Sequence, residues 1–312
     1  MKRILIAGSS NTDMIIRLTR LPRPGETLLG GEFSTAGGGK GANQALAAAR
    51  AGGDVAFIGC LGVDDLGDRA MADLAAAGID TTACRRDDRA PSGVAQILVA
   101  DDGENCIAVA PGTNALLSPE DIARAEPLLD NTAVVLLQLE TPLESVQAAL
   151  EAGRRYGCYT VLNPAPACDL PPALPGLIDL MTPNETEVEY LTGIQVSDNG
   201  SAERAAQALN AKGVRDVIIT RGSEGVTLSR QTANGGIVAR HFPAFPVTAI
   251  DTTAAGDVFN GCLAAGLAVG TDLADAIPFA QAASALAVQR SGAQGSIPYR
   301  EEILAFLSDR AQ

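Results

Sequence analysis

Short apolar runs alternate with amphipathic stretches along most of this chain. Six apolar runs begin near residues 3, 54, 133, 159, 177 and 216, and read RILIAG, DVAFIG, AVVLLQLE, YTVLNPA, LIDLMTPN and DVIITRG. They are too short for helices and are typical of buried strands. Apolar residues at helical spacing follow from Ala42, Gly67, Pro142, Ser201 and Leu273. The alternation predicts an α/β fold: a doubly wound, mainly parallel sheet flanked by helices, with ligands at the carboxyl ends of the strands.

Two segments interrupt this alternation, residues 13–37 and 91–112. Each has the pattern of paired strands around a turn, which is PRPGE in the first and DDGE in the second. We therefore expect a small antiparallel sheet inserted at two points into an α/β domain made of residues 1–12, 38–90 and 113–312. Such a sheet buries little by itself, so it should cover a cleft as a β lid or pair with a second subunit.

The stretch DTTAAGDVFNG, from Asp251, carries the clearest chemistry. A strand-like approach, residues 244–250, leads to a turn of small residues and then to an apolar helix. We expect the backbone N–H groups of Ala254, Ala255, Gly256 and Asp257 to point unpaired from the helix N-terminus, as an anion site. The Asp257 carboxylate could accept a proton from a hydroxyl group that attacks phosphorus. The structural alternative is a helix capped by the side chain of Thr252 or Thr253.

A second glycine cluster, GGGKGANQ from Gly37, precedes a helix but matches no nucleotide motif. A P-loop would need glycine at Ser34 and Ser or Thr at Gly41, and no GxGxxG follows the first strand. This argues against a dinucleotide oxidoreductase. Two interpretations remain: a polar loop that offers Lys40 and Asn43 to hydroxyl groups, or a plain tight turn.

The charge balance limits the partners and the compartment. Lys and Arg total 23 against 37 Asp and Glu, a net charge of -14 at pH 7. Such a field repels phosphate backbones and anionic lipid surfaces, so we expect neither nucleic acid nor membrane as a partner. No apolar run approaches the roughly 20 residues of a membrane helix, and the run after Lys2 and Arg3 is too short for a signal peptide. We expect a cytoplasmic protein.

The cysteines and the single histidine argue against a dithiol redox motif, a zinc site and a Ser-His-Asp triad. The six cysteines are scattered without a CxxC pair, so we expect buried thiols in a reducing compartment. His241 is the single histidine and lies in a strand-like segment, which leaves little basis for a Ser-His-Asp triad or a zinc site.

Nine motifs, in order along the chain, resemble the phosphofructokinase-B (ribokinase-like) family of carbohydrate kinases. They are AGSSNTD, PRPGET, GGGKGANQ, LLQLETPLESV, NPAPA, TPNETEVEYLTG, TRGSEGV, DTTAAGDVFNG and RSGAQGSIPYREEI, and the match runs from Ile4 to about Leu307. The resemblance implies ATP-dependent phosphorylation of D-ribose at its O5 hydroxyl. It implies Asp257 as the base and the backbone of Ala254, Ala255 and Gly256 as the anion hole. The sugar-binding positions that it implies, besides Asp257, are Asn11, Asp13, Gly39, Lys40, Asn43 and Glu140.

The resemblance also implies sites for the nucleotide and for cations. Asn184 and Glu187 would organise Mg²⁺, through water, since Mg²⁺ keeps much of its hydration shell. The side chain of Arg221 could point to solvent or add a charge near the nucleotide. The ATP-binding positions implied are Asn184, Thr220, Arg221, Gly222, Ser223, Glu224, Gly225, Gly256 and Gln281. Those implied for an activating K⁺ beside the anion hole are Asp251, Thr253, Ala287, Arg290, Gly292 and Ser296.

Several alternatives stay open at this stage. Within the family, the substrate could be 2-deoxyribose, a nucleoside or another furanose, because specificity can depend on one or two lid residues. Outside enzymes, a sugar-binding regulatory protein could retain the fold without turnover, although such a protein has no need of Asp257 at a phosphate-binding turn. We also expect the β lid to form a homodimer contact, as the resemblance implies.

Overall fold

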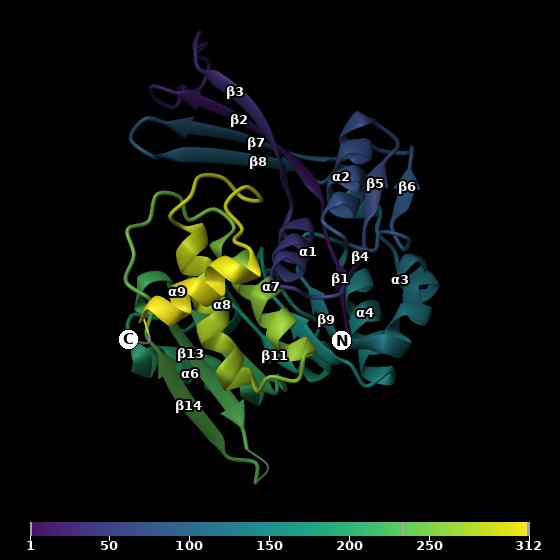
Figure 1. The fold of residues 1–312 in the computed structure, drawn as a ribbon, viewed down its shortest axis with the longest axis vertical. Coiled ribbons are helices and arrows are strands. Elements are labelled where there is room, and N and C mark those ends of the chain that lie inside the picture. Colours follow the sequence, from purple (N-terminus) through teal and green to yellow (C-terminus); the bar gives the residue numbers. More distant parts are fainter. Residues whose placement is uncertain (1, 233, 311–312) are drawn as a thin grey trace.

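The centre of the molecule is an eight-stranded sheet with the strand order β14-β13-β12-β11-β10-β9-β1-β4 (Figure 1). The computed structural model describes residues 2–232 and 234–310. All six predicted strands are present and parallel, and an antiparallel hairpin that the sequence analysis did not identify extends the sheet at β12. The strands are β1 (Arg3–Ala7), β4 (Val55–Ile58), β9 (Thr132–Leu137), β10 (Tyr159–Leu162), β11 (Leu180–Met181), β12 (Asp216–Thr220), β13 (Val226–Gln231) and β14 (Ile237–Phe242).

Helices cover both faces of this sheet, so that each of the six parallel strands contributes to two cores. Ile4 and Ile6 of β1 belong to one core and Leu5 and Ala7 to the other, because successive side chains of a strand point to opposite faces. The first core includes residues of α1 (Lys40–Arg50), α2 (Asp65–Ala76), α7 (Ala255–Ala268), α8 (Leu273–Ala287) and α9 (Arg300–Arg310). The second includes residues of α3 (Pro119–Ala125), α4 (Leu143–Arg155), α5 (Glu185–Thr192) and α6 (Asn199–Ala211).

The helices that the apolar spacing predicts are all present, whereas α3, α5 and α9 were not identified. α3 and α5 are too short for a periodic pattern, and α9 buries only Ile303 and Phe306. In the part of the chain that the structure describes, no helix is both long and apolar enough to cross a membrane. Short 3₁₀ helices complete the set: η1 (Gly112–Leu116), η2 (Glu126–Asn131), η3 (Pro175–Leu177) and η4 (Gly222–Glu224).

The strand-like approach expected at residues 244–250 is wrong. These residues form an irregular segment between β14 and α7. Pro243 and Pro246 lie at its start, and proline has no N–H group with which to join a sheet ladder. The apolar residues are nevertheless used, because Phe245 and Val247 pack against the core beside α8.

A smaller four-stranded sheet, here called the lid sheet, projects from one end of the molecule (Figure 1). Its order is β3 (Glu32–Gly38), β2 (Asn11–Leu18), β7 (Gly93–Ala100) and β8 (Asn105–Ala110). β2 pairs antiparallel with β3, and β7 with β8, at the two segments that the sequence singled out. The two pairs join through parallel pairing of β2 with β7, which the pattern alone did not specify. β2 thus starts in the body of the molecule, at Asn11, and runs outward.

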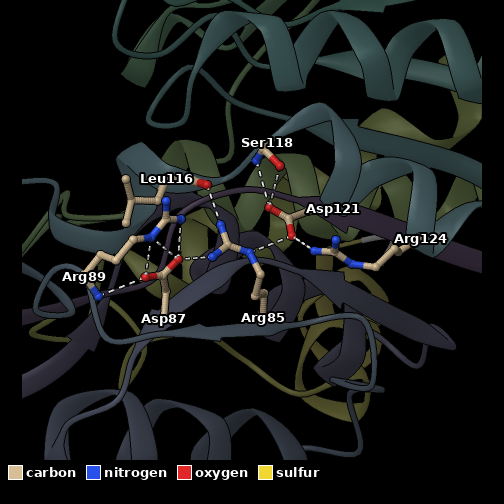
Figure 2. Close-up of polar contacts among 7 residues, drawn as sticks. All are labelled: Arg85, Asp87, Arg89, Leu116, Ser118, Asp121 and Arg124. Carbon is tan, nitrogen blue, oxygen red and sulfur yellow. Dashed lines mark hydrogen bonds and ion pairs between the residues drawn. The ribbon is translucent and has the colours of Figure 1, made fainter.

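An ionic network holds both ends of the β7–β8 hairpin at one place (Figure 2). Arg85 lies in β6 (Arg85–Asp87), which pairs with β5 (Cys60–Gly62) before the hairpin. Its Nε donates to Asp121 Oδ1 at 2.7 Å and its Nη2 to Leu116 O at 2.5 Å, both after the hairpin. Arg85 also pairs with the buried Asp87, which Arg89 contacts as well. The network fixes the base from which the lid sheet extends.

Candidate active site

The N-terminus of α7 presents free backbone N–H groups. Ala254, its N-cap residue, has φ 60° and ψ 9°, and among the described residues it is the one non-glycine residue with positive φ. Ala255 N–H donates to Thr252 O at 3.2 Å, so the expectation that this group is unpaired is wrong. The N–H groups of Ala254, Gly256 and Asp257 donate to no acceptor among the described residues. Left-handed backbone at a non-glycine residue costs roughly 1–2 kcal/mol, and here it accompanies free N–H groups at a helix N-terminus, which are suited to bind an anion.

No side chain caps this helix, which removes the structural alternative for the stretch. Neither Thr252 nor Thr253 makes a capping hydrogen bond to α7. The free N–H groups at this helix N-terminus therefore remain available to an anion, with the Asp257 carboxylate beside them in the first turn.

Asp257 is buried in this first turn, and two amides of α1 donate to it. Asn43 Nδ2 lies 2.9 Å from Asp257 Oδ2, and Gln44 Nε2 lies 3.0 Å from Oδ1. Burial raises the pKa of Asp257, while Lys40 and the two amide hydrogen bonds act in the opposite direction, and the net pKa lies above its ordinary value. The carboxylate is thus desolvated and oriented, as a general base must be.

The segment before α1 is a tight turn, in which Gly39 alone separates β3 from α1, and it packs against residues that follow the first strand. Gly39 has φ 86°, and a Cβ at this position would lie 2.7 Å from the backbone N of Asn11, so only glycine fits. Glu140 Oε2 accepts hydrogen bonds from Lys40 N–H at 3.0 Å and from Ser9 Oγ at 2.5 Å. The loop and Glu140, which follows β9, are therefore held together.

Carboxylates are concentrated around Lys40. Burial, then the charges of Glu140 and Asp257, raise the pKa of Asp13 to about 6. Burial by itself would lower the pKa of Lys40, but the neighbouring carboxylates, Asp257 first, raise it above its ordinary value. Lys40 therefore stays positively charged and partly offsets the negative charge of the site.

Asn11 is oriented by a residue that the sequence analysis missed. Asn114, in η1, donates from Nδ2 to Asn11 Oδ1 at 2.7 Å, and its Oδ1 accepts from Ser10 N–H at 2.9 Å. Asn114 directly follows the segment of the β7–β8 hairpin, and no local motif marks it. Gln44, the last residue of GGGKGANQ, also contacts Asp257, and the motif by itself predicts no role for it.

Two adjoining cavities meet at the start of α7. The smaller, of about 220 Å³, is lined by Lys40, Asn184, Glu187 and Asp257 among others. The larger, of about 520 Å³, is mostly apolar and passes between Phe245, Phe259 and Gln281. Together they have the size of small-molecule sites. The residues that line both are Thr220, Thr252, Ala255 and Gly256.

Two of the expected nucleotide positions lie apart from these cavities. Gly222, Ser223 and Gly225 line the larger cavity, but Arg221 and Glu224 line neither. The Arg221 side chain is buried and donates from Nη1 to Asn199 Oδ1 at 2.5 Å. The expectation that Arg221 points to solvent is therefore wrong, because its buried guanidinium bonds to Asn199 at the start of α6. A charge contributed by Arg221 near the nucleotide stays a prediction.

The residues expected to organise Mg²⁺ form the start of α5. Asn184 Oδ1 accepts from Glu187 N–H at 2.8 Å, and Glu187 Oε2 accepts from Asn184 N–H at 2.8 Å. Both residues line the smaller cavity beside Asp257, and burial raises the pKa of Glu187. A desolvated carboxylate and an amide facing a cavity fit a hydrated Mg²⁺, which is held through few direct ligands.

The segments expected to hold K⁺ are joined by Asp251. Its Oδ1 accepts from Thr253 N–H at 2.9 Å and its Oδ2 from Gly292 N–H at 2.8 Å. Burial raises the pKa of Asp251, but these hydrogen bonds hold it below the usual value, so the carboxylate is charged. The carbonyl groups of Thr253, Arg290 and Gly292 accept no hydrogen bond from the described residues, whereas that of Ala287 accepts one from Arg290 N–H. Ser296 is fully buried, with Oγ donating to Ala293 O.

Comparisons with known proteins agree with this geometry. The pfkB family carbohydrate kinase model matches residues 1–300. A ribokinase of Haemophilus influenzae is 45% identical over 306 residues, 98% of each chain. A deoxyribokinase of Salmonella typhi is 38% identical, again over 98% of each chain. The structure of Arabidopsis thaliana ribokinase complexed with ribose and ATP superposes with a TM-score of 0.88 at 31% identity, covering 98% of both chains. Because the family model and these relatives span almost all of it, the chain belongs to the pfkB family of carbohydrate kinases.

Proposed function

We propose that this protein transfers the γ-phosphoryl group of ATP to the O5 hydroxyl of D-ribose, giving ribose 5-phosphate and ADP. The observation that carries the proposal is the buried Asp257 carboxylate beside the free N–H groups of Ala254 and Gly256, where two cavities meet. Ribokinases at up to 45% identity, and one such structure with ribose and ATP, support this substrate pair.

The proposed reaction is an in-line displacement. Asp257 accepts the proton of O5 as the O5–phosphorus bond forms, and the bond between the γ-phosphorus and the bridging oxygen breaks, its electron pair leaving with ADP. The N–H groups at the start of α7 and the Lys40 ammonium stabilise the charge that develops on the phosphoryl oxygens. The lid sheet excludes water, so that ATP is not hydrolysed instead.

The sugar subsite that we propose combines acceptors from three elements. Asn11 and Asp13 of β2 and Glu140 after β9 would accept hydrogen bonds from hydroxyl groups, while Asn43 and the loop at Gly39 and Lys40 would complete the subsite. A site that hydrogen-bonds each hydroxyl disfavours an analogue lacking one, because a buried partner is then left unsatisfied. 2-Deoxyribose is the second candidate substrate, because a deoxyribokinase also aligns over nearly the full chain.

For the nucleotide, we assign the apolar cavity to adenine and ribose and the start of α7 to the phosphates. Thr220, Gly222, Ser223, Gly225 and Gln281 would form its walls. Asn184 and Glu187 would hold Mg²⁺ through water, and bound Mg²⁺ neutralises charge on phosphate oxygens.

We further propose a K⁺ site at Asp251 and the carbonyl groups of Thr253, Arg290 and Gly292, with Ala287 and Ser296 beside it. The charged Asp251 and three carbonyl groups without hydrogen bonds support this donor set. Thr253 immediately precedes Ala254, so a bound cation would order the turn that forms the anion site.

We propose that a second copy of the chain packs on the lid sheet. All six residues of β8, an edge strand, are exposed, and Phe33, Ile107 and Val109 are exposed to 64%, 55% and 52%. Such an edge with apolar side chains is a template for pairing with another chain. We also place the protein in the cytoplasm, since its six cysteines are free thiols.

The first prediction concerns turnover and the base. Release of ADP from Mg-ATP, measured across ribose, 2-deoxyribose, fructose and nucleosides, should be fastest with ribose. Asp257→Asn should lower kcat by about 10²- to 10⁴-fold, the usual contribution of a general base. The matched control is Asp216→Asn, a buried carboxylate in the first position of β12, which should keep kcat. Faster turnover of another sugar would identify that sugar as the substrate in place of ribose. No turnover of any sugar would favour a sugar-binding protein without catalytic activity.

The second prediction concerns pH. The pKa of Asp13 is raised to about 6, so Asp13 is a charged carboxylate, able to accept hydrogen bonds from sugar hydroxyl groups through both oxygens, only above that pH. kcat/KM for ribose should therefore fall about tenfold for each pH step below 6. The folded state also binds this proton more tightly than the unfolded chain, so Asp13 stabilises folding at low pH and costs stability above pH 6. Asp13→Asn should raise Tm at pH 7 while weakening ribose binding, and an unchanged acid limb in this variant would contradict the assignment.

The third prediction concerns the monovalent cation. At equal ionic strength, the rate of ADP release should be higher in KCl than in NaCl, because the cation orders the turn before Ala254. Asp251→Asn should reduce this difference. Equal rates of the unmodified protein in the two salts would count against the site.

The fourth prediction concerns assembly. Sedimentation velocity should give twice the chain mass, and Ile107→Glu should give the monomer because it places a charge in the contact. Val238→Glu is the matched control: Val238 is exposed to 58% on β14, at the far end of the molecule from the lid sheet in Figure 1. A monomeric unmodified protein at micromolar concentration would refute the dimer.

A further inference from the structure

Gln44 is a fully buried amide that lines neither cavity, yet it contacts Asp257 directly. Its Nε2 donates to Asp257 Oδ1 at 3.0 Å and to Asn163 Oδ1 at 3.1 Å, so both N–H bonds are used. Asn163 follows β10, and Gln44 lies one residue beyond Asn43 in α1. The contact therefore joins the helix that carries Asn43 to the carboxyl edge of the main sheet.

A third buried amide determines which way the Gln44 side chain points. Gln138 follows β9, and its Nε2 donates to Gln44 Oε1 at 2.6 Å. Because an amide oxygen only accepts and an amide nitrogen only donates, this bond turns the Gln44 nitrogen toward Asp257. Asn163 is fixed in the same way, since its Nδ2 donates to Thr182 O at 3.1 Å and leaves its oxygen toward Gln44.

Gly8 makes room for this arrangement. A Cβ on Gly8 would lie 2.1 Å from Gln138 Oε1, so the Gln138 amide occupies the space that any other side chain would need. Gln138 Oε1 itself has no hydrogen-bond partner among the described residues. An unsatisfied buried oxygen costs stability. The Gln138 amide thus carries a cost in stability, as expected for a residue whose role is to orient Gln44.

We propose that Gln44 is the positioning residue for the catalytic base, and that Gln138 and Asn163 hold Gln44 in the orientation that this role requires. The assignment rests on the proposed phosphoryl transfer, in which Asp257 takes the hydroxyl proton. With Asn43 on Oδ2 and Gln44 on Oδ1, the carboxylate plane is fixed between two donors from one helix.

The two donors also counteract the surroundings of Asp257. Burial favours its protonated form, and so do the charges of Glu140, Asp13 and Glu187, whereas Lys40 favours the carboxylate. Hydrogen bonds to the charged form favour that form. Loss of the Gln44 bond should therefore leave Asp257 protonated to a higher pH, and thus unable to act as a base.

The test compares Gln44→Met, which keeps the volume and removes the donor, with Gln138→Met, which leaves the donor but frees its orientation. In Gln44→Met, kcat should fall about tenfold to a hundredfold, the size expected for a lost hydrogen bond to a charged group. The acid limb of kcat, which reports groups in the bound complex, should move up by about one to two pH steps. Gln138→Met should shift the limb in the same direction by less, and KM for sugar and for ATP should change little in both.

The matched control is Asn210→Leu, which removes a buried amide of α6 that donates to Val214 O and accepts from Ser229 Oγ of β13. It should lower Tm without moving the acid limb. A folded Gln44→Met protein with an unmoved acid limb would overturn the proposal. ¹³C NMR titration of the Asp257 carboxyl group, without substrate, separates this outcome from failure of the proposed function. A higher Asp257 pKa in Gln44→Met than in the unmodified protein supports the positioning role even if no sugar is turned over. An unchanged Asp257 pKa refutes it.

Discussion

The close packing of α1 against α7 is the contact on which the site depends. A Cβ on Gly261 of α7 would lie 2.4 Å from Gln44 O and 2.6 Å from Ala47 Cβ, so the two helices approach at the distance that glycine and alanine permit. This approach brings the amides of Asn43 and Gln44 to Asp257, 214 and 213 positions away along the chain. A larger residue at position 261 would separate the two donors from the carboxylate, even though Asn43, Gln44 and Asp257 themselves were unchanged.

The electrostatics of the site follow from that packing. Glu140, Glu187 and Asp257 act on the ammonium group of Lys40, and Asp13 lies near Glu140 and Asp257. Burial raises the pKa of three of these four carboxyl groups, those of Asp13, Glu187 and Asp257. Such a cluster disfavours an anionic ligand unless N–H donors and cations compensate. The free N–H groups before α7 supply donors without a side chain, which is why a strained alanine at position 254 is tolerated.

The small sheet, called the lid sheet, and the body are linked at well-defined places. β2 carries Asn11 and Asp13 outward from the body, and the Arg85 network holds the two ends of the β7–β8 hairpin together. The side chains that we propose to bind the sugar therefore lie at the junction between an anchored base and a projecting sheet. This arrangement suits a site that must admit substrate and then exclude water.

Much of this protein could be predicted from local pattern, because strand and helix periods, glycine turns and short motifs are properties of neighbouring residues. The six apolar strands, the two inserted segments of paired strands and the turn of small residues at 254–257 are of this kind. The order of the strands in the sheet is not, because it depends on contacts between distant segments. The left-handed turn in which Ala255 bonds back to Thr252, and the irregular segment at Pro243 and Pro246, are local features that the pattern nevertheless did not predict. Tertiary structure was needed where a role depends on residues far apart in sequence, as for Arg221 bonding to Asn199 and Gln138 orienting Gln44. These outcomes are set by which donors and acceptors the packing of helices on the sheet brings within hydrogen-bond distance, and no local pattern encodes that distance.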